Sequence, residues 1–305
     1  MTRDAPRERP DLADRLPPEL LGPVRHVAGV LGEAGHRVWV VGGAVRDLLY
    51  ADRGRAAPVK DADLVSAALP DEVEALFPRT VAVGKSFGIV VVVVDGVELE
   101  VATFREERGY SDRRRPDEVR FTDSLELDAR RRDFTINALY LDPLTGQIED
   151  PTDGVRDLDA GVLRAVGRAA DRFREDGLRI LRMARFQARF GLEAAEGLHR
   201  AAREESESLA GVSPERVLDE LSKMVSGGGV AGAVRTLVDV GAAERVLPGW
   251  TPESAHERLR DVEALGAHPP LTAVLAALLG ADGVDSARER AALLRASRGT
   301  VRGTG

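Results

Sequence analysis

The chain has 305 residues, 43% of them hydrophobic, which is enough for a substantial core and for two or more domains. It contains no cysteine, so disulfides and cysteine-ligated zinc are excluded. The net charge of −8 argues against a protein that binds polyanions through overall charge alone. The start lacks the apolar stretch of a signal peptide, and every apolar run is too short to span a bilayer. We therefore expect a cytoplasmic protein with no membrane contact.

The first half of the chain shows short strand and helix patterns. Residues 1–17 are charged and contain prolines, which is typical of a loose leader. Helical apolar spacing predicts a helix over 20–34 that ends near Gly35. The next segments predict a strand, a helix, a strand, a helix and two strands over 37–41, 45–50, 61–65, 70–77, 89–94 and 97–103. Asp95-Gly96 between the last two is a hairpin signal, so we expect a small mixed sheet with helices over about residues 18–150.

The second half of the chain has a different character. Residues 105–120 are charged, contain Gly109 and Pro116, and lack periodicity, which predicts a mobile loop. After Gly154 the strand signal almost vanishes. Helical spacing then covers residues 169–190, 213–226, 230–240, 252–265 and 271–279. The predicted fold class is α+β: an N-terminal head with a small mixed β-sheet and helices, followed by an all-α neck and body.

A glycine turn precedes a pair of acids. Gly42-Gly43 lies between a predicted strand and a predicted helix, and the backbone N–H groups of such a turn suit a triphosphate. Asp61 and Asp63 follow as Asp-x-Asp, which on a strand places both carboxylates on one face. Such a pair suits hard divalent cations such as Mg²⁺. Together these features indicate an enzyme that moves a nucleotidyl group.

A third acid on a later predicted strand strengthens this interpretation. Glu98 and Glu100 share one strand face, and we interpret Glu98 as a solvated hairpin residue and Glu100 as the third acid. Three converging carboxylates can hold two metal ions, one to lower the pKa of an attacking 3′-hydroxyl and one to stabilise the leaving pyrophosphate. The candidate catalytic residues are therefore Asp61, Asp63 and Glu100, with Asp61 and Asp63 as metal ligands.

Polar residues interrupt the apolar segment 131–139. Its apolar members, which we expect to be buried, are Phe134, Ile136 and Leu139. Arg132, Asp133 and Asn137 lie among them and need partners. One interpretation is a structural ion pair at a helix start. The other is that Arg132 recognises phosphate, and that Asp133 or Asn137 recognises ribose hydroxyls.

A charged series begins at Asp176 and recurs every three residues. Its members, which are expected to be neighbours on a helix surface, are Asp176, Arg179, Arg182 and Arg185. One interpretation is a salt-bridged exposed face. The other is base recognition, because a carboxylate accepts from an exocyclic amine while an arginine donates to a ring acceptor. Cytosine and adenine present that pair of groups, whereas uracil and guanine place a carbonyl oxygen against the carboxylate, so an Asp/Arg pair can select C and A without a nucleic-acid template.

At these residues the chain resembles the bacterial-type tRNA nucleotidyltransferases, the CCA-adding enzymes. They belong with bacterial poly(A) polymerases to the DNA polymerase β-like nucleotidyltransferase superfamily. The matching segments run in order from about Val38 to Val225 and are residues 41–47, 60–64, 84–90, 100–105, 131–138, 150–154, 175–179 and 213–217. One segment alone is a weak match, whereas the ordered series is highly specific.

The resemblance implies a layout of head, neck, body and tail. The corresponding ranges are a leader at 1–17, a catalytic head at 18–154, a nucleotide-templating neck at 155–226, and a body at 227–305 with a short or missing tail. It implies that Gly43, Arg46 and Arg132 contact the triphosphate and sugar. With the residues named above, the candidate nucleotide-binding residues of the head are Gly42, Gly43, Arg46, Arg132, Asp133 and Asn137. The resemblance also implies that Asp176 and Arg179 template CTP and ATP, supported by Arg182 and Arg185.

The resemblance further implies the reaction and the roles of two segments. The reaction is template-independent addition of C and A to the tRNA 3′ end through a two-metal, Mg²⁺-dependent in-line attack. Residues 105–120 correspond to a flexible loop that helps to switch the pocket from C to A. Residues 213–225 correspond to a structural motif in which Glu215 and Arg216 are scaffold.

Other readings stay open at this point. A relative that adds only A or only CC, and a poly(A) polymerase, share these motifs. An RNA-binding protein on a nucleotidyltransferase fold is the non-enzymatic alternative, although decay is not evident at the acids and arginines named above.

Overall fold

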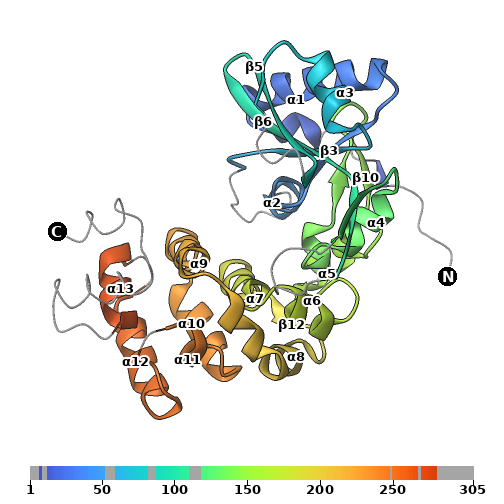
Figure 1. The fold of residues 1–305 in the computed structure, drawn as a ribbon. Helices are drawn as coiled ribbons and strands as arrows, with labels where there is room; N and C mark the ends of the chain where they lie inside the picture. The colour runs from blue at the N-terminus through green and yellow to red at the C-terminus, as the bar shows by residue number, and fades with distance from the viewer. Residues whose placement is uncertain are drawn as a thin grey trace. The chain divides into compact units, whose positions relative to one another are not determined.

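The computed structural model describes residues 7–8, 12–51, 59–81, 87–109, 118–247, 249–266 and 269–279 (Figure 1). The chain forms two compact units. The first unit comprises residues 1–109 and 117–160, and the second comprises residues 110–116 and 161–305. The first unit therefore ends at Ala160, beyond the predicted head boundary at Gly154. The predicted division between neck and body at residues 226 and 227 stays a prediction.

A mixed eight-stranded sheet forms the first unit, in the order β1-β10-β9-β2-β3-β6-β5-β4. Its strands are β1 (Arg7–Glu8), β2 (Val38–Val41), β3 (Asp63–Ser66), β4 (Thr80–Val81), β5 (Ile89–Val94), β6 (Val97–Thr103), β9 (Tyr140–Leu141) and β10 (Gln147–Glu149). The pair β3–β6 is parallel and the other pairs are antiparallel. A separate antiparallel pair consists of β7 (Arg105–Arg108) and β8 (Glu118–Phe121).

Helical segments accompany this sheet, and the helices predicted over 20–34, 45–50 and 70–77 are all present. The segments are η1 (Ala13–Arg15), α1 (Pro18–Glu33), α2 (Gly43–Ala51), α3 (Pro70–Leu76), α4 (Leu125–Arg130), η3 (Thr135–Asn137) and α5 (Gly154–Ala160). Figure 1 shows α1 and α3 beside β5 and β6, and these elements are in contact. Leu31, Val40 and Leu99 are among the buried core side chains. The hairpin turn is also as predicted, because Asp95 and Gly96 both have positive φ, at 51° and 80°.

Two predictions for the first unit were wrong in part. The leader is not loose where it is described, because β1 pairs with β10, and Leu12, Ala13 and Leu16 are buried. The segment 105–120 is not a loop throughout, because its two ends form the strands β7 and β8. Residues 110–117, the centre of that segment, lie outside the described residues. In the leader the partner strand lies far away in the sequence, whereas β7 and β8 pair with each other; in both cases pairing between strands outweighs the weak local pattern.

In its described residues the second unit is almost entirely helical, although the neck predicted as all-α also contains a short strand pair. The fold class α+β is confirmed for the chain. The helices of the second unit are α6 (Ala169–Glu175), α7 (Leu178–Phe190), α8 (Leu198–Glu204), η4 (Ser206–Gly211), α9 (Pro214–Ser226), α10 (Val230–Asp239), α11 (Ala243–Val246), α12 (Pro252–Ala264) and α13 (Leu271–Leu279). A short parallel pair joins β11 (Val162–Leu163) to β12 (Glu193–Ala194). The helices predicted over 213–226, 230–240, 252–265 and 271–279 are present within a residue of these bounds.

The prediction of a single helix over 169–190 is wrong, because the helix is interrupted between α6 and α7. Asp176 has extended backbone angles, with φ −149° and ψ 105°. A Cβ on Gly177 would lie 2.5 Å from the carbonyl carbon of Ser208, so only glycine fits there. The break places Asp176 before α7 rather than on its surface. In the part of the chain that the structure describes, no helix is long and apolar enough to cross a membrane.

Candidate functional site

Three acids lie at neighbouring positions of the first unit's sheet. Asp63 is the first residue of β3, and Asp61 lies just before this strand rather than on it. Both are exposed while Ala62 between them is buried, and because Asp61 lies off the strand, the predicted shared face stays a prediction. Glu100 lies on the adjacent strand β6, in the parallel register that pairs Leu64 with Val101. Glu98 is also exposed, as expected of a solvated residue.

The charges of these acids act on one another. Partial burial, with the negative charges of Asp61 and Glu100, raises the pKa of Asp63 to about 6. The positive charge of Arg132 opposes this rise. Among the described residues, no three acids, histidines or cysteines are already gathered closely enough to form a metal site. The donor set still fits a divalent cation, because its oxygens are hard ligands and their mutual repulsion is what a cation relieves.

The glycine turn lies between β2 and α2. Gly42 has a φ of +72°, which side chains with a Cβ rarely adopt, and its N–H donates to the carbonyl of Leu139 at 3.2 Å. Arg46, one turn into α2, is only 5% exposed. Its guanidinium donates to Asp47 and to Oδ1 of Asn137, 91 residues away. This geometry makes Arg46 a support for the turn, and its predicted contact with nucleotide stays a prediction.

The segment after α4 supplies the other predicted head residues. Phe134, Ile136 and Leu139 are fully buried, as expected. Asp133 accepts from the side chain of Asn137 at 3.0 Å and from the N–H of Phe134 at 2.8 Å. The structure therefore joins Arg46, Asn137 and Asp133 in one hydrogen-bonded series.

Arg132 is held by two residues that the sequence analysis missed. It donates to Oδ2 of Asp128 at 2.9 Å and to the hydroxyl of Tyr140 at 3.0 Å. Burial opposes the charge of Asp128, but Arg132 and Arg131 outweigh it and lower the pKa of Asp128 to about 2. Nη1 of Arg132 lies 3.7 Å from the point that a Cβ on Gly42 would occupy. The guanidinium is thus directed at the glycine turn.

Asp176 in the second unit is paired with Arg216, a residue that was predicted as scaffold. Nη1 and Nη2 of Arg216 donate to its two oxygens at 3.1 Å and 2.7 Å. Its Oδ1 also accepts from the N–H of Leu178 at 3.1 Å, at the start of α7. Arg216 was predicted only as scaffold, and no sequence spacing indicates this pair because the two residues are 40 positions apart.

The three predicted arginines of α7 are all ion-paired. Arg179 is 9% exposed and donates to Glu175 at 2.6 Å. Arg185 donates to the buried Glu220 of α9 at 2.7 Å, and Arg182 lies 3.7 Å from the same carboxylate. Asp176 and Arg179 are thus paired with Arg216 and Glu175, while Arg182 and Arg185 share Glu220, so the four residues do not form one exposed face.

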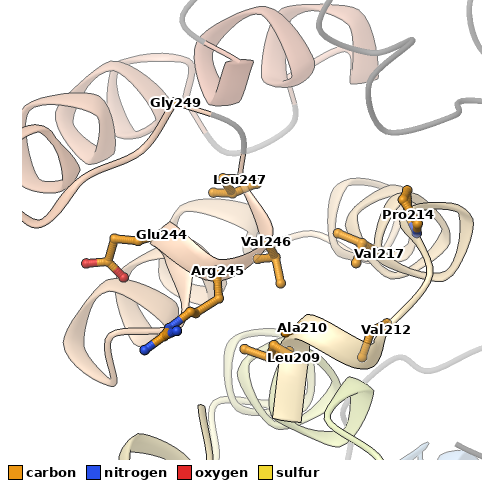
Figure 2. A pocket seen from close by; sticks show the side chains of 10 residues that line it. All are labelled: Leu209, Ala210, Val212, Pro214, Val217, Glu244, Arg245, Val246, Leu247 and Gly249. Carbon is orange, nitrogen blue, oxygen red and sulfur yellow. The ribbon is translucent and has the colours of Figure 1, made fainter. Parts of the chain in front are cut away.

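A pocket of about 260 Å³ occurs elsewhere in the second unit (Figure 2). Figure 2 shows its walls, which come from η4, α9 and α11 and are mainly aliphatic, with side chains such as Leu209, Val217 and Val246. None of the predicted site residues lines it. The candidate site is therefore defined by the charged residues above and not by this pocket.

Two family models match the chain. The model described as "Poly A polymerase head domain" matches residues 38–164, and the one described as "Probable RNA and SrmB- binding site of polymerase A" matches residues 191–254. A CCA-adding enzyme of Geobacillus thermodenitrificans is 43% identical over 219 residues, covering 72% of this chain and 52% of the relative. That of Bacillus subtilis is 42% identical over 224 residues, covering 73% and 55%. The chain thus spans about half the length of these curated relatives.

Solved structures agree with these matches. The CCA-adding enzyme of Bacillus stearothermophilus in complex with CTP aligns with a TM-score of 0.78 and 34% identity, covering 94% of this chain and 68% of that one. The Thermotoga maritima CCA-adding enzyme complexed with tRNA aligns with a TM-score of 0.73 and 25% identity, covering 94% and 70%.

Proposed function

This chain belongs to the family of bacterial-type CCA-adding enzymes, and we propose on that premise that it adds C and A to the 3′ end of tRNA from CTP and ATP. The observation that carries the proposal is the arrangement in the first unit. Asp61 and Glu100 both lie within electrostatic reach of Asp63. Arg132 acts on the same group and is directed at the Gly42 turn. An acidic cluster beside a phosphate-binding turn is the minimum that nucleotidyl transfer needs.

In the proposed reaction the first unit binds the triphosphate and aligns the attack. The 3′-hydroxyl oxygen of the tRNA forms a bond to the α-phosphorus, the bond to the bridging oxygen breaks, and pyrophosphate leaves. Arg132 and the backbone N–H groups after Gly42 hold the phosphates, while Asp133 or Asn137 contacts the ribose. Asp61 and Asp63 would hold Mg²⁺, two ions in the proposed form. Bound metal supplies a lower pKa for the hydroxyl and stabilises the charge of the leaving group.

Base selection is proposed for the second unit. Oδ2 of Asp176 accepts from Arg216, and a carboxylate oxygen accepts two hydrogen bonds, so this oxygen retains capacity for an exocyclic amine. The Arg179 guanidinium, fixed by Glu175, would donate to the ring acceptor beside that amine. Under this proposal residues 18–154, 155–226 and 227–305 act as head, neck and body. A tRNA substrate places the activity in the cytoplasm.

The proposal is tested by primer extension with Mg²⁺. The substrates are tRNAs that end before CCA, after C and after CC, each offered the four nucleotides singly and CTP with ATP. We expect addition of C, C and A followed by a stop. A product that ends at CC, or A added only to the CC-ended tRNA, would identify a partial-activity relative. Long A tails on any RNA would identify a poly(A) polymerase. No extension, with CTP and ATP still bound, would contradict the proposal.

A further inference from the structure

A chain of alternating charges joins β7 to Arg132 within the first unit. Glu107 of β7 accepts from Nε of Arg105 at 2.7 Å and from Nη1 of Arg131 at 3.3 Å. Arg131 donates through Nε to Oδ1 of Asp128 at 2.8 Å. The other oxygen of Asp128 accepts from Arg132 at 2.9 Å. Each charge along this path therefore lies between charges of the opposite sign.

The residues of this path are largely buried, and burial strengthens the ion pairs between them. The Asp128 side chain is fully buried, and those of Glu107 and Arg131 are 7% and 17% exposed. Charges in such surroundings interact more strongly than on an open surface, and removal of one leaves its partners without compensation. The members of the chain therefore hold one another in place.

The β7 end of this series of ion pairs is held by neighbouring segments. Nη1 of Arg105 donates to the carbonyl of Phe87, and Glu107 pairs with Val119 of β8 in the antiparallel register. The position of Glu107 thus depends on the β7–β8 pair. Because Arg131 is ion-paired with Glu107, the position of the Arg131 guanidinium depends on it as well.

The division of the Asp128 carboxylate couples the two arginines. Oδ1 accepts a hydrogen bond from Arg131, whereas Oδ2 accepts from Arg132 and from the Tyr140 hydroxyl. A rotation of this carboxylate that follows Arg131 moves Oδ2 as well, because the two oxygens share one planar group. The orientation of Arg132 toward Gly42 therefore depends on Arg131.

We propose that Glu107 is a positioning residue for nucleotide binding, and that through Arg131 and Asp128 it holds the Arg132 guanidinium in place to receive the triphosphate. The inference rests on the proposed function, because it assigns Arg132 to the phosphates. It adds a role for the β7–β8 pair, whose residues are not among the candidate site residues of the sequence analysis.

Glu107→Gln tests this assignment, with Glu33→Gln as a matched control on an exposed position at the end of α1. The measurement is the KM and kcat for CTP and for ATP in primer extension, with Kd for both nucleotides in the presence of Mg²⁺. We expect Glu107→Gln to raise KM about tenfold while kcat changes less than about threefold, because a ground-state phosphate contact is weakened. The control is expected to match the wild-type chain.

A double-mutant cycle with Arg131→Gln tests the path itself. If Glu107 acts through Arg131, then Glu107→Gln has no further effect on KM once Arg131 is replaced. Three results would each overturn the inference. They are an unchanged KM for Glu107→Gln, a fall in kcat as large as the rise in KM together with a lower melting temperature, and additive effects in the cycle. If Glu107→Gln does not fold, Arg131→Gln alone is held to the same split between KM and kcat. A wild-type chain that binds neither nucleotide overturns the proposed function itself, whereas intact wild-type binding with an unaffected variant overturns only this inference.

Discussion

Asp63 and Asp128 show at the residue scale how one side chain type serves two purposes. Asp63 is surrounded by other acids, and its pKa is raised to about 6. Asp128 is buried between two guanidiniums, and its pKa is lowered to about 2. The first carboxylate is left uncompensated and suits a cation, whereas the second is neutralised within the protein. Charge environment, rather than residue type, distinguishes a candidate ligand from a structural acid.

The metal-ligand assignment predicts the behaviour of Asp61→Asn and Asp63→Asn. Each should lower the rate of nucleotide addition by at least about a hundredfold, because each removes an anionic ligand. Thermal stability should hold or rise, since both side chains are exposed and repel their neighbours. Primer extension and the melting temperature check this, with Asp14→Asn, at an exposed surface ion pair, as the control. Extension at the wild-type rate by either variant would rule out the assignment.

The base-selection assignment predicts that Asp176→Ala loses discrimination. Without the carboxylate, nothing disfavours the carbonyl oxygen of uracil or guanine, so incorporation of UTP and GTP should rise relative to CTP and ATP. The preference is expected to fall by about tenfold or more, the usual value of a lost hydrogen bond to a charged group. The ratio of kcat/KM among the four nucleotides measures it. Retained selection of CTP and ATP would show that Asp176 does not read the base.

At the element scale, the junction of α6 and α7 decides where Asp176 points. The helix pattern continues through this junction in the sequence, but close approach of Ser208 to Gly177 divides it. The carboxylate then accepts from the N–H of Leu178, the first residue of α7, and from Arg216 of α9. Three helical elements are therefore needed to place one candidate recognition group.

Gly177→Ala should disturb this junction. The added Cβ would meet backbone atoms of Ser208 at 2.5 Å, so the chain must shift, at a cost of about 2 kcal/mol in the free energy of unfolding. Discrimination among nucleotides should fall with it, because Asp176 is adjacent. Denaturant unfolding and nucleotide selectivity measure the two effects.

Gly232→Ala in α10 is the matched control in the same unit. Its Cβ would lie 3.5 Å from that of Ala188, an ordinary contact, and alanine favours a helix over glycine. This variant should be neutral or more stable by up to about 1 kcal/mol. A Gly177→Ala variant as stable as this control would contradict the close-approach argument.

At the scale of the whole molecule, the pairing of Asp128 makes stability depend on pH. Its pKa is lower in the folded chain than the ordinary 3.8, so its contribution is present above about pH 4 and is lost as pH falls toward 2. The wild-type chain should exceed Asp128→Asn in free energy of unfolding by roughly 2 kcal/mol at pH 5, and this difference should vanish near pH 2. Urea unfolding at several pH values checks this, and a difference that does not change with pH would contradict it.

The fold was predictable wherever a local pattern agreed with the tertiary contacts. The helix over 271–279 and the hairpin turn at Asp95-Gly96 follow from periodicity and turn chemistry alone. The exposure of Asp63 beside the buried Leu64 of the same strand follows from strand alternation. Strand β7 and the break at Gly177 did not follow, because the first depends on pairing with β8 and the second on close approach of Ser208.

The sequence by itself determined which chemical groups this protein presents: the glycine turn, the paired acids and the arginine series. Only the tertiary structure decided which of these groups are held, and by what. Arg46 meets Asn137 across 91 positions, and Asp176 meets Arg216 across 40. Periodicity in the sequence describes neighbours within one helix or strand, whereas packing between elements sets the partner of a buried charge. The partners of these charges therefore could not be inferred from periodicity.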